Sequence, residues 1–196
     1  LTSGGTESIN TALKGFFWER NADGSRPVII VPAGEHHATL DTADWLAAHA
    51  GADVYSVALA SDGSIPVSGI AEALRDNHGR VALVTALWVN NEVGTVSDID
   101  AIAELCAAEG VPLHVDAVAA VYEQIDFTAR RERTGSGAGA GLVAVSVSAH
   151  KLGGPVGAGA LILGREVTPE PLLHGGGQQR QRRSGTQDVA AAAAFA

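Results

Sequence analysis

The sequence predicts an α/β fold of three layers, with a mostly parallel sheet between two layers of helices. Short apolar runs alternate repeatedly with segments whose apolar residues recur at helical spacing. Some of these runs are apolar throughout, which is typical of strands buried on both faces. Hydrophobic residues make up 46% of the 196 residues, which is enough for a core and fits a single domain over 1–196.

The strands are expected where apolar runs end at turn residues. The first run, at 28–31, ends at Pro32 and Gly34. A later run is followed by the turn pair Asp62-Gly63. The further strands are expected at 54–59, 81–88, 111–115, 142–147 and 158–163.

The helices are expected between these strands. The first covers 8–13 and closes at Gly15, the second covers 40–50 and stops at Gly51, and a third covers 70–77. Ser97 and Asp100 have capping-box spacing and are expected to open a fourth helix, which stops at Gly110. Segment 129–141 is charged and then Gly/Ser-rich, so it is expected to be a flexible surface loop.

The composition excludes some classes of partner. The formal net charge of -9 disfavours binding to nucleic acid or to an anionic membrane, although residues 180–183 are locally basic. No apolar stretch approaches the ~20 residues of a membrane span, and no signal peptide is visible. Cys106 is the only cysteine, which agrees with a cytoplasmic location, and its helical spacing with Ile99 and Ile102 predicts a core thiol.

Polar residues at strand ends are the candidate site, because ligands of parallel sheets bind at the carboxyl ends of the strands. Asn91 follows one strand, where it either contacts a ligand or belongs to an ordinary Asn/Gly turn. Asp116 ends another, where it faces a cationic partner or caps a helix. Lys151 follows a third, either as a desolvated amine that forms an imine or as a lysine that reaches solvent.

Two further segments have a functional and a structural interpretation. Gly4 and Gly5 precede a helix, so they form an anion cradle with Thr6, or a glycine turn with Thr6 as the N-cap. His36 follows a strand and a Pro/Gly turn, where it stacks on a flat ring or lies solvated in a loop. The adjacent His37 does not complete a closed metal site, so no metal is expected.

Taken in order, six strings of residues resemble cysteine desulfurases, which belong to the class V aminotransferase group of pyridoxal 5'-phosphate (PLP) enzymes. The strings are Thr2-Ser3-Gly4-Gly5-Thr6-Glu7, Glu35-His36, Asn90-Asn91-Glu92-Val93-Gly94, His114-Val115-Asp116-Ala117, Ser148-Ala149-His150-Lys151 and Arg183-Ser184-Gly185-Thr186. The resemblance runs from Thr2 to Ala196, with an insertion near 129–141. The resemblance implies the PLP-dependent transferase fold. It also implies that the chain is the large domain of that fold, similar to the one in aspartate aminotransferase and truncated at both ends.

The resemblance also implies roles for individual residues. Lys151 would bind PLP covalently, Asp116 would pair with the ring nitrogen, and His36 would stack on the ring and move protons. Asn91 would bond the ring hydroxyl. The residues expected around the phosphate are Gly5, Thr6, Ser148 and His150. Thr186 is expected to reach the phosphate of the other subunit, which implies a homodimer with shared sites.

The implied reaction removes sulfur from L-cysteine and leaves alanine and an enzyme persulfide. The persulfide would supply a sulfur-acceptor protein, as in iron–sulfur cluster assembly. The persulfide cysteine and the arginine that binds the substrate carboxylate are expected downstream of Ala196, so the fragment alone is expected to be inactive. Ala119 stands where the family usually has Gln, which removes one contact to the ring hydroxyl.

Two other functions remain open at this point. Selenocysteine lyases and other class V enzymes share the same cofactor residues and would differ elsewhere. A non-catalytic PLP-fold subunit that acts as a scaffold is the alternative from a different class, and Ala119 favours it.

Overall fold

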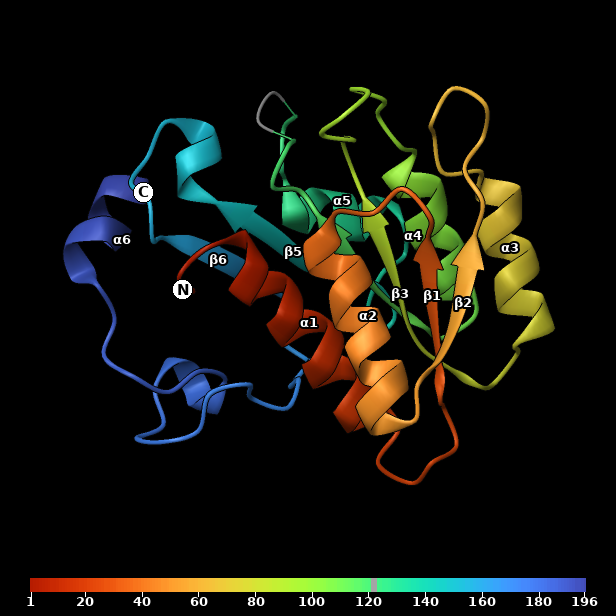
Figure 1. The fold of residues 1–196 in the computed structure, drawn as a ribbon, viewed down its shortest axis with the longest axis horizontal. Helices are drawn as coiled ribbons and strands as arrows, with labels where there is room; N and C mark the ends of the chain where they lie inside the picture. The colour runs from red at the N-terminus through yellow and green to blue at the C-terminus, as the bar shows by residue number, and fades with distance from the viewer. Residues whose placement is uncertain (121–122) are drawn as a thin grey trace.

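A six-stranded sheet forms the middle layer of the computed structural model, which describes residues 1–120 and 123–196 (Figure 1). The strand order is β2-β1-β3-β4-β5-β6, and every neighbouring pair is parallel except β5 and β6. The strands are β1 (Val28–Pro32), β2 (Asp53–Val57), β3 (Val81–Leu87), β4 (Pro112–Asp116), β5 (Gly141–Ser148) and β6 (Gly159–Leu163). The predicted fold class and its mostly parallel sheet are therefore confirmed.

Helices cover both faces of the sheet. Figure 1 shows α1 and α2 in front of the sheet and α4 and α5 behind it, with α3 beside β2. The helices are α1 (Gly5–Arg20), α2 (His37–Ala50), α3 (Val67–Asp76), α4 (Ile99–Ala108), α5 (Phe127–Arg133) and α6 (Val189–Phe195). Short 3₁₀ helices, η1 (Ala149–Leu152) and η2 (Gln179–Gln181), lie in the connections.

The sheet separates two hydrophobic cores. Ile29 and Val31 of β1 pack with α1 and α2, whereas Val28 and Ile30 of the same strand pack with α3 and α4. This alternation follows from the two-residue period of a strand. All residues of β1, β3, β4 and β5 are buried, which explains why these strands read as continuous apolar runs.

The first helix is longer than the sequence predicts. Gly15 was expected to close it, but α1 continues to Arg20 and Gly15 is buried within it. A Cβ at this position would lie 2.6 Å from the carbonyl oxygen of Glu170. Gly15 is therefore the point where another segment packs closely against the helix, and the prediction of a helix end was wrong.

Two other local predictions were wrong in part. Asp98, rather than Ser97, caps α4, because its side chain accepts a hydrogen bond from Ala101 N at 3.1 Å. The first part of the expected loop 129–141 belongs to α5, which Asp126 caps in the same way. Ion pairs from α5 to other elements, such as Arg133 to Asp100 at 2.6 Å, help to hold this helix in place.

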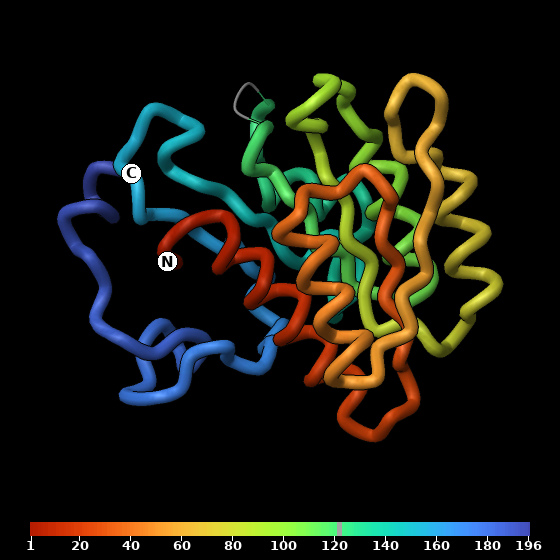
Figure 2. Tube along the Cα trace, in the orientation of Figure 1, coloured from red at the N-terminus to blue at the C-terminus, as the bar shows by residue number. Residues whose placement is uncertain are grey.

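The segment after β6 lies beside α1 and β6, on the side of the molecule opposite β2 and α3 (Figures 1 and 2). The start of the chain joins the sheet there, because Thr2 and Gly159 exchange backbone hydrogen bonds of 2.9 Å. This bridge places the first turn of α1 next to the end of β5. The phosphate-cradle candidates and the Lys151 segment are therefore neighbours in the fold.

Candidate functional site

A cavity of about 260 Å³ opens at the carboxyl ends of β3, β4 and β5. It contains every predicted site residue except Thr186. These residues are Gly5, Thr6, His36, Asn91, Asp116, Ser148, His150 and Lys151. The other residues that line it are Ile9, Ala38, Leu87, Val118 and Ala119. Strand ends and the starts of α1 and α2 thus bring together residues that are far apart in the sequence.

Asp116 is the only acidic residue that lines the cavity within the described ranges 1–120 and 123–196. It is 2% exposed, and its Oδ1 accepts a hydrogen bond from Val118 N at 2.9 Å. That bond closes a turn; no helix begins among the described residues between Asp116 and α5, so Asp116 does not cap a helix. Burial raises the pKa of its carboxyl group, so a cationic ligand atom would be a favourable partner.

Lys151 lies in η1, which directly follows β5. Its side chain lines the cavity and is exposed, which agrees with the interpretation of a lysine that reaches solvent, and its imine with a cofactor stays a prediction. Lys14, the other lysine of this chain, lies over the ring of Trp45, 4.2 Å from its centre, and does not line the cavity. Within the part of the chain that the structure describes, Lys151 is therefore the one lysine that the fold offers to a ligand in the cavity.

The cavity residues at the end of β5 and the start of α1 are suited to an anion. Ser148 Oγ lies 2.9 Å from Nδ1 of His150, at the end of β5. The first turn of α1 begins at Gly5, where backbone N–H groups have no partner within the helix and the helix dipole favours negative charge. A Cβ at Gly5 would meet a methyl group of Val118 at 2.7 Å, so a larger residue would force the Val118 side chain to move.

Thr6 is inside the first turn of α1 rather than at its N-cap position. The N-cap is Gly4, which makes no side-chain bond and has a φ of 152° that glycine adopts readily. The interpretation of Thr6 as a simple helix cap was therefore wrong. Thr6 is exposed and lines the cavity, so its hydroxyl group is available to a bound group.

His36 is the N-cap of α2, and its Nδ1 accepts a hydrogen bond from Ala38 N at 3.0 Å. When the ring is neutral, this bond places the proton on Nε2. His36 lines the cavity near Asp116, whose pKa a charge on His36 would lower. The ring is thus held in one orientation by the backbone of its own helix.

The two asparagines after β3 have different positions. Asn90 builds the turn: its Oδ1 accepts bonds from the backbone of Glu92 and Val93, and its Nδ2 donates to Gly34 O at 3.2 Å. Asn91 lines the cavity, as does Ala119. The turn interpretation therefore holds for Asn90, and the ligand contact of Asn91 stays a prediction.

Glu35 is a buried acid that the sequence pattern does not assign to the site. Its Oε1 accepts a hydrogen bond from the backbone N–H of Leu87, a cavity residue. Burial, reinforced by the negative charge of Asp116, raises the pKa of Glu35 to about 8. The available signal in the sequence was an acid that directly follows a buried strand and a Pro/Gly turn.

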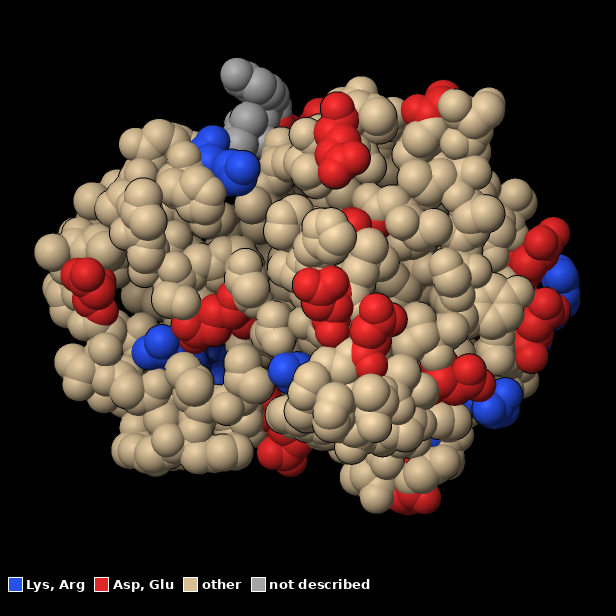
Figure 3. All heavy atoms as spheres, viewed as in Figure 1, with Lys and Arg blue, Asp and Glu red and all other residues tan. Residues whose placement is uncertain are grey.

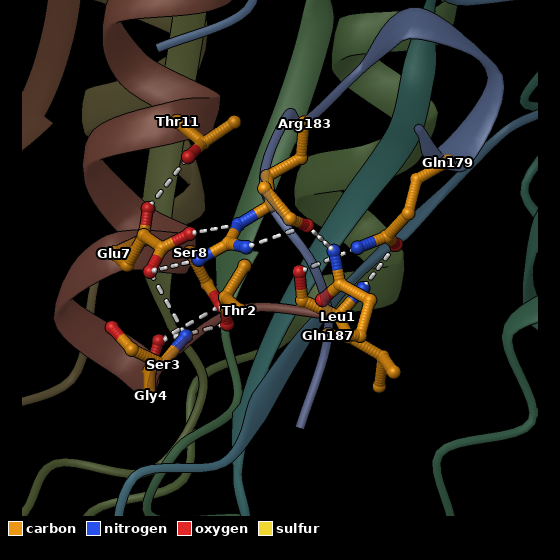
Figure 4. Close-up of polar contacts among 11 residues, drawn as sticks. Leu1, Thr2, Ser3, Gly4, Glu7, Ser8, Thr11, Gln179, Arg183 and Gln187 are labelled. Carbon is orange, nitrogen blue, oxygen red and sulfur yellow. Dashed lines mark hydrogen bonds and ion pairs between the residues drawn. The ribbon is translucent and has the colours of Figure 1, made fainter. Parts of the chain in front are cut away.

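A second hollow, of about 280 Å³, lies between α1, β6 and the arginines near η2. Figure 4 shows its neighbourhood, in which Arg183 bonds the Glu7 carboxylate and Gln179 bonds Leu1. It contains none of the predicted site residues and no lysine. Of these two hollows, as the described residues line them, the one near β3, β4 and β5 is the better candidate, because it combines a lysine, a buried acid and an anion cradle.

Thr186 lies outside the cavity, in an exposed segment near Ser3 and Asp188. Its expected contact with another subunit stays a prediction.

Within the described residues no group of three or more His, Cys, Asp or Glu side chains could hold a metal ion, and no helix is long and apolar enough to cross a membrane. Acidic side chains are spread over the face drawn in Figure 3, where basic ones are fewer.

The comparisons with known proteins agree with this geometry. The family model "Aminotransferase class-V" matches residues 1–196. The chain is 47% identical over 198 residues to an IscS-like cysteine desulfurase of Mycobacterium tuberculosis (strain ATCC 25618 / H37Rv), and the match covers 100% of this chain and 48% of that protein. The chain thus spans about half the length of the curated relatives that it matches.

Solved structures are similar over almost the whole chain. A structure of SspA in complex with cysteine has a TM-score of 0.86 and 31% identity, and the match covers 99% of this chain and 52% of that chain. The crystal structure of DndA from Streptomyces lividans has a TM-score of 0.81 and 33% identity, with coverage of 99% and 52%.

Proposed function

The chain belongs to the class-V aminotransferase family, and on that basis we propose that the full-length protein is a PLP-dependent cysteine desulfurase. The observation that carries the proposal is that Lys151 and the buried Asp116 share one cavity with an anion cradle. The names of the relatives support the same reaction, because several of them are cysteine desulfurases.

The cavity residues fit the chemical groups of PLP. The amine of Lys151 matches its aldehyde, the buried carboxyl of Asp116 matches its ring nitrogen, and the cradle at Gly5 matches its phosphate. The volume of about 260 Å³ is close to the lower end of ordinary small-molecule sites, about 300 Å³. When bound, PLP supplies an electron sink for chemistry at the amino acid's α-carbon.

The protein side chains would position the reactants and hold protons. Asp116, when ionised, would favour a proton on the ring nitrogen, because it is buried and no Lys or Arg among the described residues pairs with it. His36 would present Nε2 to the cavity while Nδ1 stays on the backbone. Lys151 is exposed within the cavity, so its amine could accept and return a proton near the substrate.

L-Cysteine is the proposed substrate, and the similar SspA structure supports this choice because it is a complex with cysteine. The thiol that takes up the sulfur would not be Cys106. That residue is 0% exposed on α4, and burial raises the pKa of its thiol, so it is a poor nucleophile. We propose that this thiol and the arginine for the substrate carboxylate belong to the remainder of the full-length protein.

The wider assignments are part of the same proposal. We propose a homodimer in which Thr186 contacts the cofactor phosphate of the other subunit, and its exposure supports this. Transfer of sulfur to an acceptor protein, a role in iron–sulfur cluster assembly and a cytoplasmic location follow from the same family resemblance.

Reductive trapping tests the cofactor assignment. The full-length protein would be reduced with borohydride, digested and searched by mass for a pyridoxyl group. We expect the label on Lys151, and Lys14 serves as an internal control because it lies over Trp45 outside the cavity. A label on Lys14, or no label on the peptide that contains Lys151, would contradict the proposal.

A further inference from the structure

Glu35 is a carboxyl group buried directly behind the candidate cavity. It lies in the turn between β1 and α2, one residue before His36, and is 5% exposed. Among residues 1–120 and 123–196, no Lys or Arg side chain bonds it. A buried carboxylate without a cationic partner is unfavourable, so this environment favours the protonated, uncharged acid.

The Glu35 side chain replaces a missing strand neighbour at the end of β3. The ladder between β1 and β3 stops at Ile30 and Val84, whereas β3 continues to Leu87. Consecutive N–H groups of a strand point to opposite sides, and Trp88 N points to β4, where it bonds Asp116 O at 3.0 Å. Leu87 N therefore points toward β1, and Oε1 of Glu35 accepts its hydrogen bond at 2.5 Å.

This bond acts on the residue pair that forms one wall of the cavity. Leu87 and Asp116 are partners in the register of β3 and β4, and both line the cavity. The second oxygen of Glu35, Oε2, is buried and has no hydrogen-bond partner among the described residues. Two carboxyl groups near each other in a buried place do not both ionise readily, because like charges repel.

We propose that Glu35 is a positioning residue of the cofactor cavity: its uncharged carboxyl group holds the end of β3 through the Leu87 amide and leaves Asp116 as the negative charge that faces a bound cofactor. The inference deepens the proposed function and rests on it for the identity of the cofactor. The raised pKa of Glu35, about 8, is consistent with an uncharged group at neutral pH. The other titratable groups nearby are His36, His114, Asp116, His150 and Lys151.

The first test measures the proton on Glu35 without any cofactor. Urea unfolding of the cofactor-free, full-length protein would be followed between pH 6.5 and pH 8.5 for the wild type, Glu35→Gln and the exposed control Glu104→Gln. Because the folded pKa is raised to about 8 from 4.5, folding retains a proton that the unfolded chain has released, so wild-type stability falls as pH rises in this window. We expect the fall of stability with rising pH that Glu35 causes to disappear in Glu35→Gln and to persist in Glu104→Gln. Parallel slopes of stability against pH in the wild type and both variants would overturn the proposal.

The second test separates the hydrogen bond from the charge. The dissociation constant of PLP would be measured by absorbance for the wild type, Glu35→Gln and Glu35→Met. An amide oxygen can still accept from Leu87 N and a thioether cannot, so we expect Glu35→Met to bind PLP about fivefold more weakly than Glu35→Gln. Equal weakening in both variants would mean that an ionised Glu35 is needed, and would overturn the proposal.

The outcomes also distinguish this inference from the proposed function. If the wild type takes up no PLP, the proposed function fails, while the pH slope of the cofactor-free protein still decides whether Glu35 keeps its proton. If Glu35→Met does not fold, the comparison of Glu35→Gln with the wild type in the first test remains decisive.

Discussion

Arg183 donates a hydrogen bond from Nε to Oε1 of Glu7 at 2.9 Å, although 176 residues separate the two in the chain (Figure 4). The two side chains are 20% and 13% exposed, so the pair is partly shielded from water. Oε2 of the same carboxylate accepts from Ser3 N at 2.9 Å. The ion pair thus ties the segment that carries Thr186 to the first turn of α1, whose start lines the candidate cavity.

We expect Glu7→Gln to lower the free energy of unfolding by about 1–2 kcal/mol, because the amide has no charge to pair with Arg183 and only one acceptor oxygen for the bonds from Arg183 and Ser3. Burial alone would raise the pKa of Glu7, but the bonds from Arg183 and Ser3 outweigh it and lower the pKa below 4.5. The contribution is therefore present above pH 4.5 and is lost as pH falls through the lowered pKa.

Urea unfolding at pH 7 and pH 3 would measure this effect, with Asp76→Asn as the control. Asp76 pairs with Arg75 on an exposed surface, so its replacement is expected to change stability by less than about 0.5 kcal/mol. A Glu7→Gln effect of the same size at both pH values would contradict the ion-pair explanation.

Asp116→Asn is expected to retain cofactor on Lys151 but to lose about 100-fold in turnover, which corresponds to about 2.7 kcal/mol of activation free energy. The amide cannot hold a proton on the ring nitrogen, so a carbanion would be poorly stabilised. Turnover and cofactor content of the full-length protein would be compared with those of Asp44→Asn, an exposed position of α2. Near-normal turnover would leave Asp116 with only its turn-closing bond to Val118.

Ala119→Gln is expected to slow cofactor dissociation about fivefold, as one added hydrogen bond of about 1 kcal/mol would do. Ala119 lines the cavity together with Asn91, so an amide there could reach a ring hydroxyl. Ala119→Leu is the matched control, because it adds similar volume without a polar group. Equal dissociation rates for the Gln and Leu variants would argue against a missing contact.

Cys106 is expected to be inert toward thiol reagents in the folded protein and reactive in urea. It is fully buried among α4 core residues, and burial raises the pKa of its thiol. Cys106→Ser is expected to cost about 1–3 kcal/mol of stability, because a hydroxyl group would be buried there. Cys106→Ala should leave sulfide release from L-cysteine by the full-length protein unchanged; loss of release in a folded variant would make this thiol the nucleophile.

Strand positions and candidate residues were predictable because their signals are local. Continuous apolar runs mark β3, β4 and β5, and Asp116 and Lys151 stand where those runs end. The carboxyl ends of parallel strands meet at one edge of a sheet, so residues after different strands could be expected in one cavity. The individual roles came from a resemblance of whole strings, since each motif alone also fits an ordinary turn or cap.

Helix boundaries were less predictable because they depend on contacts from elsewhere in the chain. Gly15 stays inside α1, where the backbone of Glu170 packs against it, although a glycine commonly ends a helix. The charged start of segment 129–141 forms part of α5, where Arg133 pairs with Asp100 of α4. Neither partner is visible from the local pattern.

The sequence by itself determined the α/β layering, the buried strands and the set of residues gathered at the sheet edge, because side-chain polarity and spacing are written directly in the chain. Only the tertiary structure decided which polar groups lose water and which face the cavity. In the sequence, Glu35 is an ordinary acid in a turn. In the fold, the ladder between β1 and β3 stops before Leu87, so Leu87 N donates its hydrogen bond to Glu35, and Asp116 lies nearby. The sequence left Lys151 as either a desolvated amine or a lysine that reaches solvent, and the fold leaves it exposed in the cavity. Burial and electrostatic environment are properties of the packed fold, so the charge state of Glu35 could not be derived from the sequence.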